Sequence, residues 1–189
     1  MYYKKLLGDR IYLSPKGVTE EEIEKYTKWM NDFNVTDYIG RSPFVVSLSG
    51  EKEWLEKSLK TSNNRDFNII DIKSNQLIGS ITFENIDFIS RKAILGIFIG
   101  DDEFRSKGYG TEAINLILEY GFKYLNLHSI RLDLLSINER AHKCYLKCGF
   151  KDTGRTREGI FIDGKYYDIL HMDILETEFI GDYIRNKNI

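Results

Sequence analysis

The sequence predicts an α/β fold with a central, mostly antiparallel sheet flanked by helices. Residues 67–100 contain three apolar runs rich in Ile and Phe with short connections between them, which indicates an antiparallel meander. Helical apolar spacing precedes these runs at residues 19–33 and follows them at residues 111–125. The chain has 189 residues and is 42% hydrophobic, which is enough for one good core. We expect a single domain over residues 1–189, with its core at about 10–175 and a C-terminal tail at 176–189.

The charge balance and the N-terminus limit the classes of partner. The 27 Lys and Arg residues against 29 Asp and Glu residues leave a formal net charge of −2, which favours neither nucleic acid nor an anionic membrane. The N-terminal segment lacks the apolar core of a signal peptide, and no run approaches the roughly 20 apolar residues that span a bilayer. We therefore expect a cytoplasmic protein. Cys144 and Cys148 lie four apart in a helical pattern without a ligand cluster, so we expect reduced thiols and no metal.

The first half of the chain predicts one strand and two helices before the meander. Residues 10–14 form the strand, and Thr19 and Glu22 fit a capping box at the start of the first helix. Residues 31–47 form a connector. Ser49 is predicted to cap the second helix, whose apolar face contains Trp54 and Leu55.

The meander strands are predicted at residues 67–73, 77–84 and 93–100. A helix follows over residues 111–125, then a strand at 130–136 with alternating apolar residues. A short helix over residues 139–148 ends at Gly149, which suits the C′ position. Strand structure is predicted to resume at Phe150, and Asp163 and Gly164 predict a type I′ turn between hairpin strands at 160–162 and 165–175.

The segment from Gly96 to Ala113 predicts an anion site. An apolar strand leads into an acidic loop, a basic pair formed by Arg105 and Lys107, and a helix that opens near Gly108 and Gly110. Glycines let backbone amides approach an anion, and the start of a helix adds a favourable dipole. The pattern therefore indicates a binding site for a phosphate-bearing cofactor.

Several interpretations of this segment compete. A P-loop needs four residues between its glycines and a Gly-Lys-Ser/Thr ending, which are absent. Residues 108–113 match the dinucleotide pattern G-x-G-x-x-G/A, and Asp133 lies at about the distance of a ribose-binding acid. Seven residues, 101–107, separate the strand from the first glycine, and the preceding strands resemble hairpins, which argues against a dinucleotide fold. A solvated glycine-rich turn is a further alternative.

Two motifs resemble the GNAT acetyltransferase superfamily. Arg105 to Gly110 fits R/Q-x-x-G-x-G/A, the pattern of that superfamily's acetyl-CoA pyrophosphate loop. Asn138, followed by A-x-x-x-Y-x-K-x-G-F from Ala141 to Phe150, resembles its second signature. The run from Tyr120 to Leu132 and the FIDGKYYD ending resemble the RimJ/RimL-like branch, and SpeG-type polyamine acetyltransferases share much of that ending.

The resemblance implies the GNAT fold, a mixed sheet with a splayed parallel pair, and a set of residues around acetyl-CoA. The CoA pyrophosphate would lie on the loop and helix start, and the pantetheine arm would pair with the strand before the loop. For Asn138, the implied contact with the CoA arm competes with a role as helix N-cap. The implied cofactor-binding residues are Ile97, Phe98, Ile99, Arg105, Lys107, Gly108, Tyr109, Gly110, Thr111, Asn138 and Tyr145.

The resemblance also suggests the catalytic groups. Spacing alone places Tyr145 on a core stripe, whereas the resemblance implies that its phenol, with a reference pKa of about 10, donates to the departing CoA sulfur. Many RimJ/RimL-like sequences carry a Glu where this chain has Ile94. Glu84 is therefore our first candidate for the general base, and Asp87 and Asp133 are further candidates. Each of the three also fits a solvated surface charge.

We thus predict an enzyme that transfers acetyl from acetyl-CoA to a primary amine by direct attack. A protein N-terminal α-amine is the favoured acceptor, and a polyamine or another small amine is the alternative. Acidic residues including Glu158 and Asp168 could also line a cationic acceptor's site. The missing Glu at Ile94 supports a different class, a CoA-binding sensor without turnover. Aromatic residues in the N-terminal helices and at Tyr166 could support a homodimer.

Overall fold

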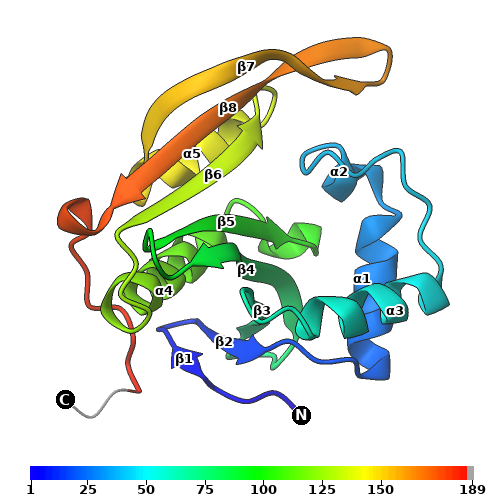
Figure 1. Ribbon diagram of the computed structural model, residues 1–189. Coiled ribbons are helices and arrows are strands. Elements are labelled where there is room, and N and C mark those ends of the chain that lie inside the picture. The colour runs from blue at the N-terminus through cyan, green and yellow to red at the C-terminus, as the bar shows by residue number, and fades with distance from the viewer. Residues whose placement is uncertain (187–189) are drawn as a thin grey trace.

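The computed structural model describes residues 1–186 and contains an eight-stranded sheet in the order β1-β2-β3-β4-β5-β6-β8-β7 (Figure 1). The strands are β1 Leu6–Leu7, β2 Ile11–Pro15, β3 Arg65–Asp71, β4 Leu77–Asp87, β5 Lys92–Ile99, β6 Ser129–Leu135, β7 Lys151–Ile162 and β8 Lys165–Leu175. The α-helices among these residues are α1 Glu20–Met30, α2 Phe33–Thr36, α3 Leu48–Leu59, α4 Tyr109–Lys123 and α5 Glu139–Lys147. All strand neighbours are antiparallel except β5 and β6, which confirms the predicted mixed sheet.

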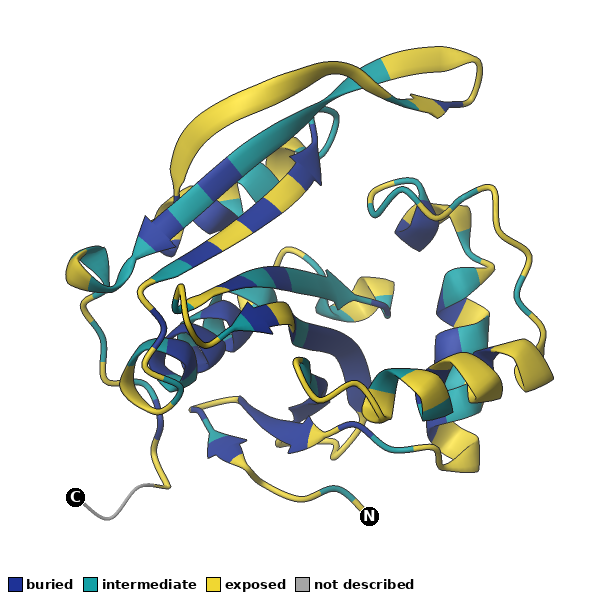
Figure 2. Cartoon of the chain, viewed as in Figure 1, coloured by how far each residue is buried: buried dark blue, intermediate teal, exposed yellow. Residues whose placement is uncertain are grey.

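Helices cover both faces of the N-terminal part of the sheet. Successive residues of a strand point to opposite faces, and here both faces are buried. Leu13 and Ile69 belong to the core cluster that contains the buried side of α4, whereas Tyr12 and Ile70 pack with residues of α1 and α3. Figure 2 shows β3 and α4 largely buried, in contrast to the exposed strand β7.

The parallel pair β5–β6 is short. It contains the residue pairs Lys92 with Ser129, Ala93 with Ile130, and Ile94 with Arg131, and beyond these the strands diverge. Figure 1 shows β6, β8 and β7 as a separate arm with α5 packed against it. From Leu95 to Ile99, alternate backbone groups that face β6 therefore have no strand partner.

Local signals in the sequence determined most element boundaries. The capping box is confirmed: the Thr19 hydroxyl accepts from the Glu22 amide at 3.3 Å, and the Glu22 carboxylate accepts from the Thr19 amide at 2.9 Å. The prediction of Ser49 as a cap is wrong. Ser47 has the extended backbone that an N-cap requires and accepts from the Gly50 amide at 3.1 Å, so Ser49 lies in the first turn.

The C-terminal hairpin and the tail extend the predicted pattern. Asp163 and Gly164 have φ angles of 46° and 75°, as a type I′ turn requires, and the strand predicted to resume at Phe150 is the continuous β7 from Lys151 to Ile162. The predicted tail packs against the sheet as far as it is described, because the Arg185 amide donates to the Leu7 carbonyl at 2.7 Å in the unpredicted strand β1. Residues 187–189 of that tail lie outside the described residues. Over residues 1–186, no helix is long and apolar enough to cross a membrane.

Candidate active site

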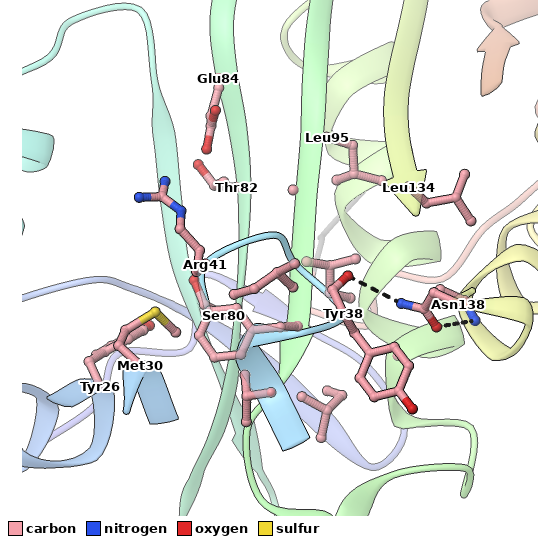
Figure 3. A pocket seen from close by; sticks show the side chains of 18 of the residues that line it. Tyr26, Met30, Tyr38, Arg41, Ser80, Thr82, Glu84, Leu95, Leu134 and Asn138 are labelled. Atoms are coloured by element: carbon pink, nitrogen blue, oxygen red, sulfur yellow. Dashed lines mark hydrogen bonds between the residues drawn. The ribbon is translucent and has the colours of Figure 1, made fainter. Parts of the chain in front are cut away.

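A cleft of about 1500 Å³ opens where β5 and β6 diverge. One end is lined by β5, the loop before α4 and the start of α5. The other end is lined by α3 and by side chains of β3 and β4. Figure 3 shows Ser80, Thr82 and Glu84 of β4 at this end. One continuous cavity therefore connects the predicted anion-binding turn to a wall of acidic side chains.

The turn at the first end of the cleft presents free backbone amides. Gly108 is the N-cap of α4 with a φ of 86°, a conformation that glycine adopts at little cost. The first intrahelical bond runs from the Glu112 amide to the Gly108 carbonyl, so the amides of Tyr109, Gly110 and Thr111 precede it. A Cβ built on Gly110 would meet no atom within 4 Å. This open space in front of a helix N-terminus fits a phosphate group.

The basic residues of the loop differ in their placement. The Arg105 guanidinium lines the cleft but donates to the carbonyls of Ile99 at 2.9 Å and Gly100 at 2.7 Å, so it fixes the loop to the end of β5. Lys107 and Tyr109 lie outside the cleft lining.

Arg10, which the sequence interpretation missed, supports this loop from outside the cleft. Its guanidinium donates to the Lys107 carbonyl at 2.8 Å and stacks over the Tyr109 ring at 4.7 Å. Arg10 lies 97 residues before Lys107 in the chain. No local motif could have revealed a contact over that separation.

The β5 segment offers its backbone to the cleft. The Phe98 ring packs edge-on against Trp29, with ring centroids 5.7 Å apart, whereas Ile97 and Ile99 pack against the core cluster beneath α4. All three residues line the cleft. Because their side chains are held on the two faces of the strand, the backbone groups along its open edge are what a ligand between β5 and β6 would meet.

Asn138 is the N-cap of α5 and also lines the cleft. Its side-chain oxygen accepts from the Ala141 amide at 3.1 Å, as an N-cap of α5 does. Its amide nitrogen donates to the Tyr38 carbonyl at 3.5 Å, a contact that connects α5 to the loop after α2 (Figure 3).

Tyr145 lies at the side of the cleft nearest α5 and is 7% exposed. Its ring packs against Phe150 at a centroid distance of 5.8 Å. Burial raises the pKa of the phenol above its usual range, so the hydroxyl keeps its proton at neutral pH. Within residues 1–186 that hydroxyl has no hydrogen-bond partner, and it is therefore free to donate to a ligand.

Among the three carboxylates considered as general base, Glu84 has the fewest interactions with other described residues. It pairs directly with Ile94 across β4 and β5, so its side chain lies beside that of Ile94. Its Oε1 is 3.7 Å from a Cβ built on Gly96. The described part of the chain gives this carboxylate no hydrogen bond or ion pair.

The other two carboxylates have partners. Asp133 lines the cleft. One of its carboxylate oxygens lies 2.7 Å from His171 Nδ1, and the other lies 3.8 Å from the Arg131 guanidinium. Asp87 lies outside the cleft lining and accepts from the amides of Ile89 and Ser90 at the turn after β4. These contacts make both carboxylates less available than Glu84 to a substrate.

The end of the cleft lined by α3, β3 and β4 contains carboxylates that the sequence interpretation did not single out. Asp66 accepts from the Thr82 hydroxyl at 2.8 Å and from the Ser58 hydroxyl at 3.3 Å. Glu51 is 4% exposed, burial raises the pKa of its carboxyl, and its Oε1 has no hydrogen-bond partner among residues 1–186. Glu158 and Asp168, which the sequence interpretation also considered for a cationic acceptor, lie on the β7–β8 hairpin outside the cleft lining.

The splayed sheet, the amide-lined turn and the cleft between them define an acyltransferase that uses acetyl-CoA. Residues 10–151 match the family model described as an acetyltransferase (GNAT) domain. The chain belongs to this family, and it is a GNAT N-acetyltransferase.

The relatives differ in their acceptors. The chain is 33% identical over 151 residues to a spermidine N(1)-acetyltransferase of Vibrio cholerae, covering 80% of this chain and 86% of the relative. It is 30% identical over 106 residues to YdaF of Bacillus subtilis, provisionally named as a ribosomal N-acetyltransferase, with 56% and 57% covered. The crystal structure of the Vibrio cholerae spermidine N-acetyltransferase in complex with CoA and spermine superposes with a TM-score of 0.81 at 30% identity, covering 89% of this chain and 97% of the other.

Proposed function

We propose that this protein transfers the acetyl group of acetyl-CoA to a primary amine of a small acceptor that carries more than one ammonium group. The observation that supports this proposal is the acidic wall of the cleft, formed by the carboxylates Glu51, Asp66 and Glu84 of α3, β3 and β4, at an end that Lys16, Arg41 and Lys57 also line. Carboxylates on one wall favour a cationic ligand. The similarity to spermidine acetyltransferases supports the same class of acceptor.

The donor would bind at the other end of the same cleft. The amides of Gly110 and Thr111, two residues that line the cleft, and the dipole of α4 suit the pyrophosphate of CoA. The pantetheine arm would lie along the open edge of β5, where its amide groups take the place of a paired strand. This arrangement directs the thioester toward Gly96 and Tyr145.

Two side chains supply the proton transfers in the proposed reaction. The amine must lose a proton before its nitrogen attacks the thioester carbon, and Glu84 accepts that proton directly or through water. The new C–N bond forms as the C–S bond breaks. The Tyr145 hydroxyl, which burial keeps protonated, then donates its proton to the departing sulfur.

The test measures CoA release with a series of acceptors at fixed acetyl-CoA. Spermidine, 1,4-diaminobutane, butylamine and a short peptide with a free N-terminus differ in charge and in the type of amine. We expect kcat/KM for at least one of the two polyamines to exceed that for butylamine by about tenfold, because the additional ammonium meets the acidic wall. Equal values for all amines would refute the proposal. Binding of CoA without turnover of any acceptor would favour the sensor class instead.

A protein N-terminal α-amine is the second candidate acceptor. The similarity to YdaF supports it, and the cleft of about 1500 Å³ is large enough for the first residues of a peptide. A peptide with a kcat/KM above that of both polyamines in the same series would favour this acceptor.

A further inference from the structure

We propose that Lys16 occupies an ammonium-binding cage in the acceptor end of the cleft, and that it thereby limits how many charges the acceptor carries. The inference rests on the proposed small-amine function, because it names the determinant of acceptor charge at the same site. It predicts that a diamine is a better acceptor than a triamine.

The cage consists of one carboxylate and two aromatic rings. The Lys16 side chain is 3% exposed, and its Nζ lies 3.8 Å from Asp66 Oδ1. The same nitrogen lies 5.0 Å from the centroid of the Tyr26 ring and 5.6 Å from that of Trp54. Aromatic faces combined with a carboxylate form a common binding site for alkylammonium ions.

The cage is held in place by groups other than Lys16. The hydroxyls of Thr82 and Ser58 donate to the two oxygens of Asp66. Tyr26 packs edge-on against Trp29 with ring centroids 5.5 Å apart, and its hydroxyl donates to Asn68 Oδ1 at 2.7 Å. The site would therefore keep its shape if another ammonium took the place of the lysine.

Lys16 is bound by charge more than by hydrogen bonds. Its Nζ has no hydrogen bond to any of residues 1–186, and its ion pair with Asp66 is long. Burial lowers the pKa of this ammonium, and the charges of Asp66, Glu51 and Glu84 act in the opposite direction. A free alkylammonium ion could therefore occupy the same site in a variant that lacks the Lys16 ammonium.

The charge of Lys16 has a direct consequence for acceptors. Glu51, Asp66 and Glu84 line this end of the cleft together with the cationic side chains of Lys16, Arg41 and Lys57, and among these cations Lys16 is the one whose ion pair with Asp66 is formed, at 3.8 Å. An acceptor that brings a second ammonium close to the cage meets a like charge. Two unit charges about 10 Å apart at an effective dielectric constant of about 20 disfavour each other by enough to change affinity on the order of tenfold.

The first experiment compares acceptors in wild type and Lys16→Met. We expect the kcat/KM of spermidine relative to 1,4-diaminobutane to rise by about tenfold in Lys16→Met, because the like charge is removed. Lys52→Met, which removes a charge from an exposed position of α3 outside the cleft lining, is the matched control and should keep the wild-type ratio. An unchanged ratio in Lys16→Met, with both amines turned over, would overturn the inference while leaving the proposed function intact.

The second experiment requires no turnover, so it separates failure of the inference from failure of the proposed function. Butylammonium is added to Lys16→Ala without acetyl-CoA, and the thermal unfolding midpoint is measured. We expect the midpoint to rise by several degrees more than in wild type, because the amine fills the empty cage and binds only the folded protein. The double variant Lys16→Ala with Asp66→Asn should lose this gain. If Lys16→Ala does not fold, Lys16→Gln is used in its place; equal shifts in variant and wild type would refute the cage.

Discussion

Removing the Tyr145 hydroxyl tests the proposed chemistry with little disturbance of the fold. The phenylalanine ring keeps the packing against Phe150, and the lost hydroxyl has no hydrogen bond to the described residues. The free energy of unfolding should therefore change by no more than about 0.5 kcal/mol. Catalysis should change far more, because a proton donor in the transition state contributes at least about 100-fold to kcat, or about 2.7 kcal/mol.

The assay for Tyr145→Phe separates binding from chemistry. Spectrophotometric detection of the released thiol gives kcat, isothermal titration with CoA gives the dissociation constant, and thermal unfolding reports stability. We expect kcat to fall about 100-fold while CoA affinity and stability stay at wild-type values. Two outcomes would refute the reasoning: an unchanged kcat, or parallel losses of kcat and of CoA affinity that would indicate a packing role.

Three further substitutions, two of them with a control variant, test the general base, the turn before α4 and the N-cap of α1. Glu84→Gln should lower kcat/KM about 100-fold, whereas Asp87→Asn should keep the wild-type value because Asp87 accepts from amides of a turn outside the cleft. Gly108→Ala and Gly164→Ala both place alanine at a positive φ and should each cost about 1 kcal/mol or more in calorimetry, but we expect only Gly108→Ala to raise the KM for acetyl-CoA. Thr19→Ala should lower the free energy of unfolding in urea by about 1 kcal/mol without changing KM; no loss would mean that the capping box contributes nothing.

The fold could be predicted because its signals are local. The capping box of Thr19 and Glu22 and the turn at Asp163 and Gly164 are each encoded by neighbouring residues, and the structure contains both. The mistaken cap at Ser49 has the same local origin. Two serines lie two residues apart, and the backbone angles that select Ser47 cannot be obtained from residue type alone.

The site was predictable only where its residues form a contiguous motif. Residues 105–111 fall on one turn, so their proximity follows from the sequence. The position of Glu84 beside Ile94 depends instead on the register of β4 and β5, which includes an irregularity between Glu84 and Asp87. Lys16 and Asp66 come from separate elements, and neither residue has a sequence signal that indicates the other.

The short ladder between β5 and β6 leaves a strand edge open in the middle of the sheet. An exposed strand edge is a template on which another polypeptide can add, which is a route to aggregation. The outer edges of this sheet are protected, because β1 is only 2 residues long and β7 carries Lys151, Arg155 and Arg157. The open edge of β5 lies inside a cleft instead. An extended ligand in that cleft can therefore bind the unpaired backbone groups of β5, in the place that a further strand would take.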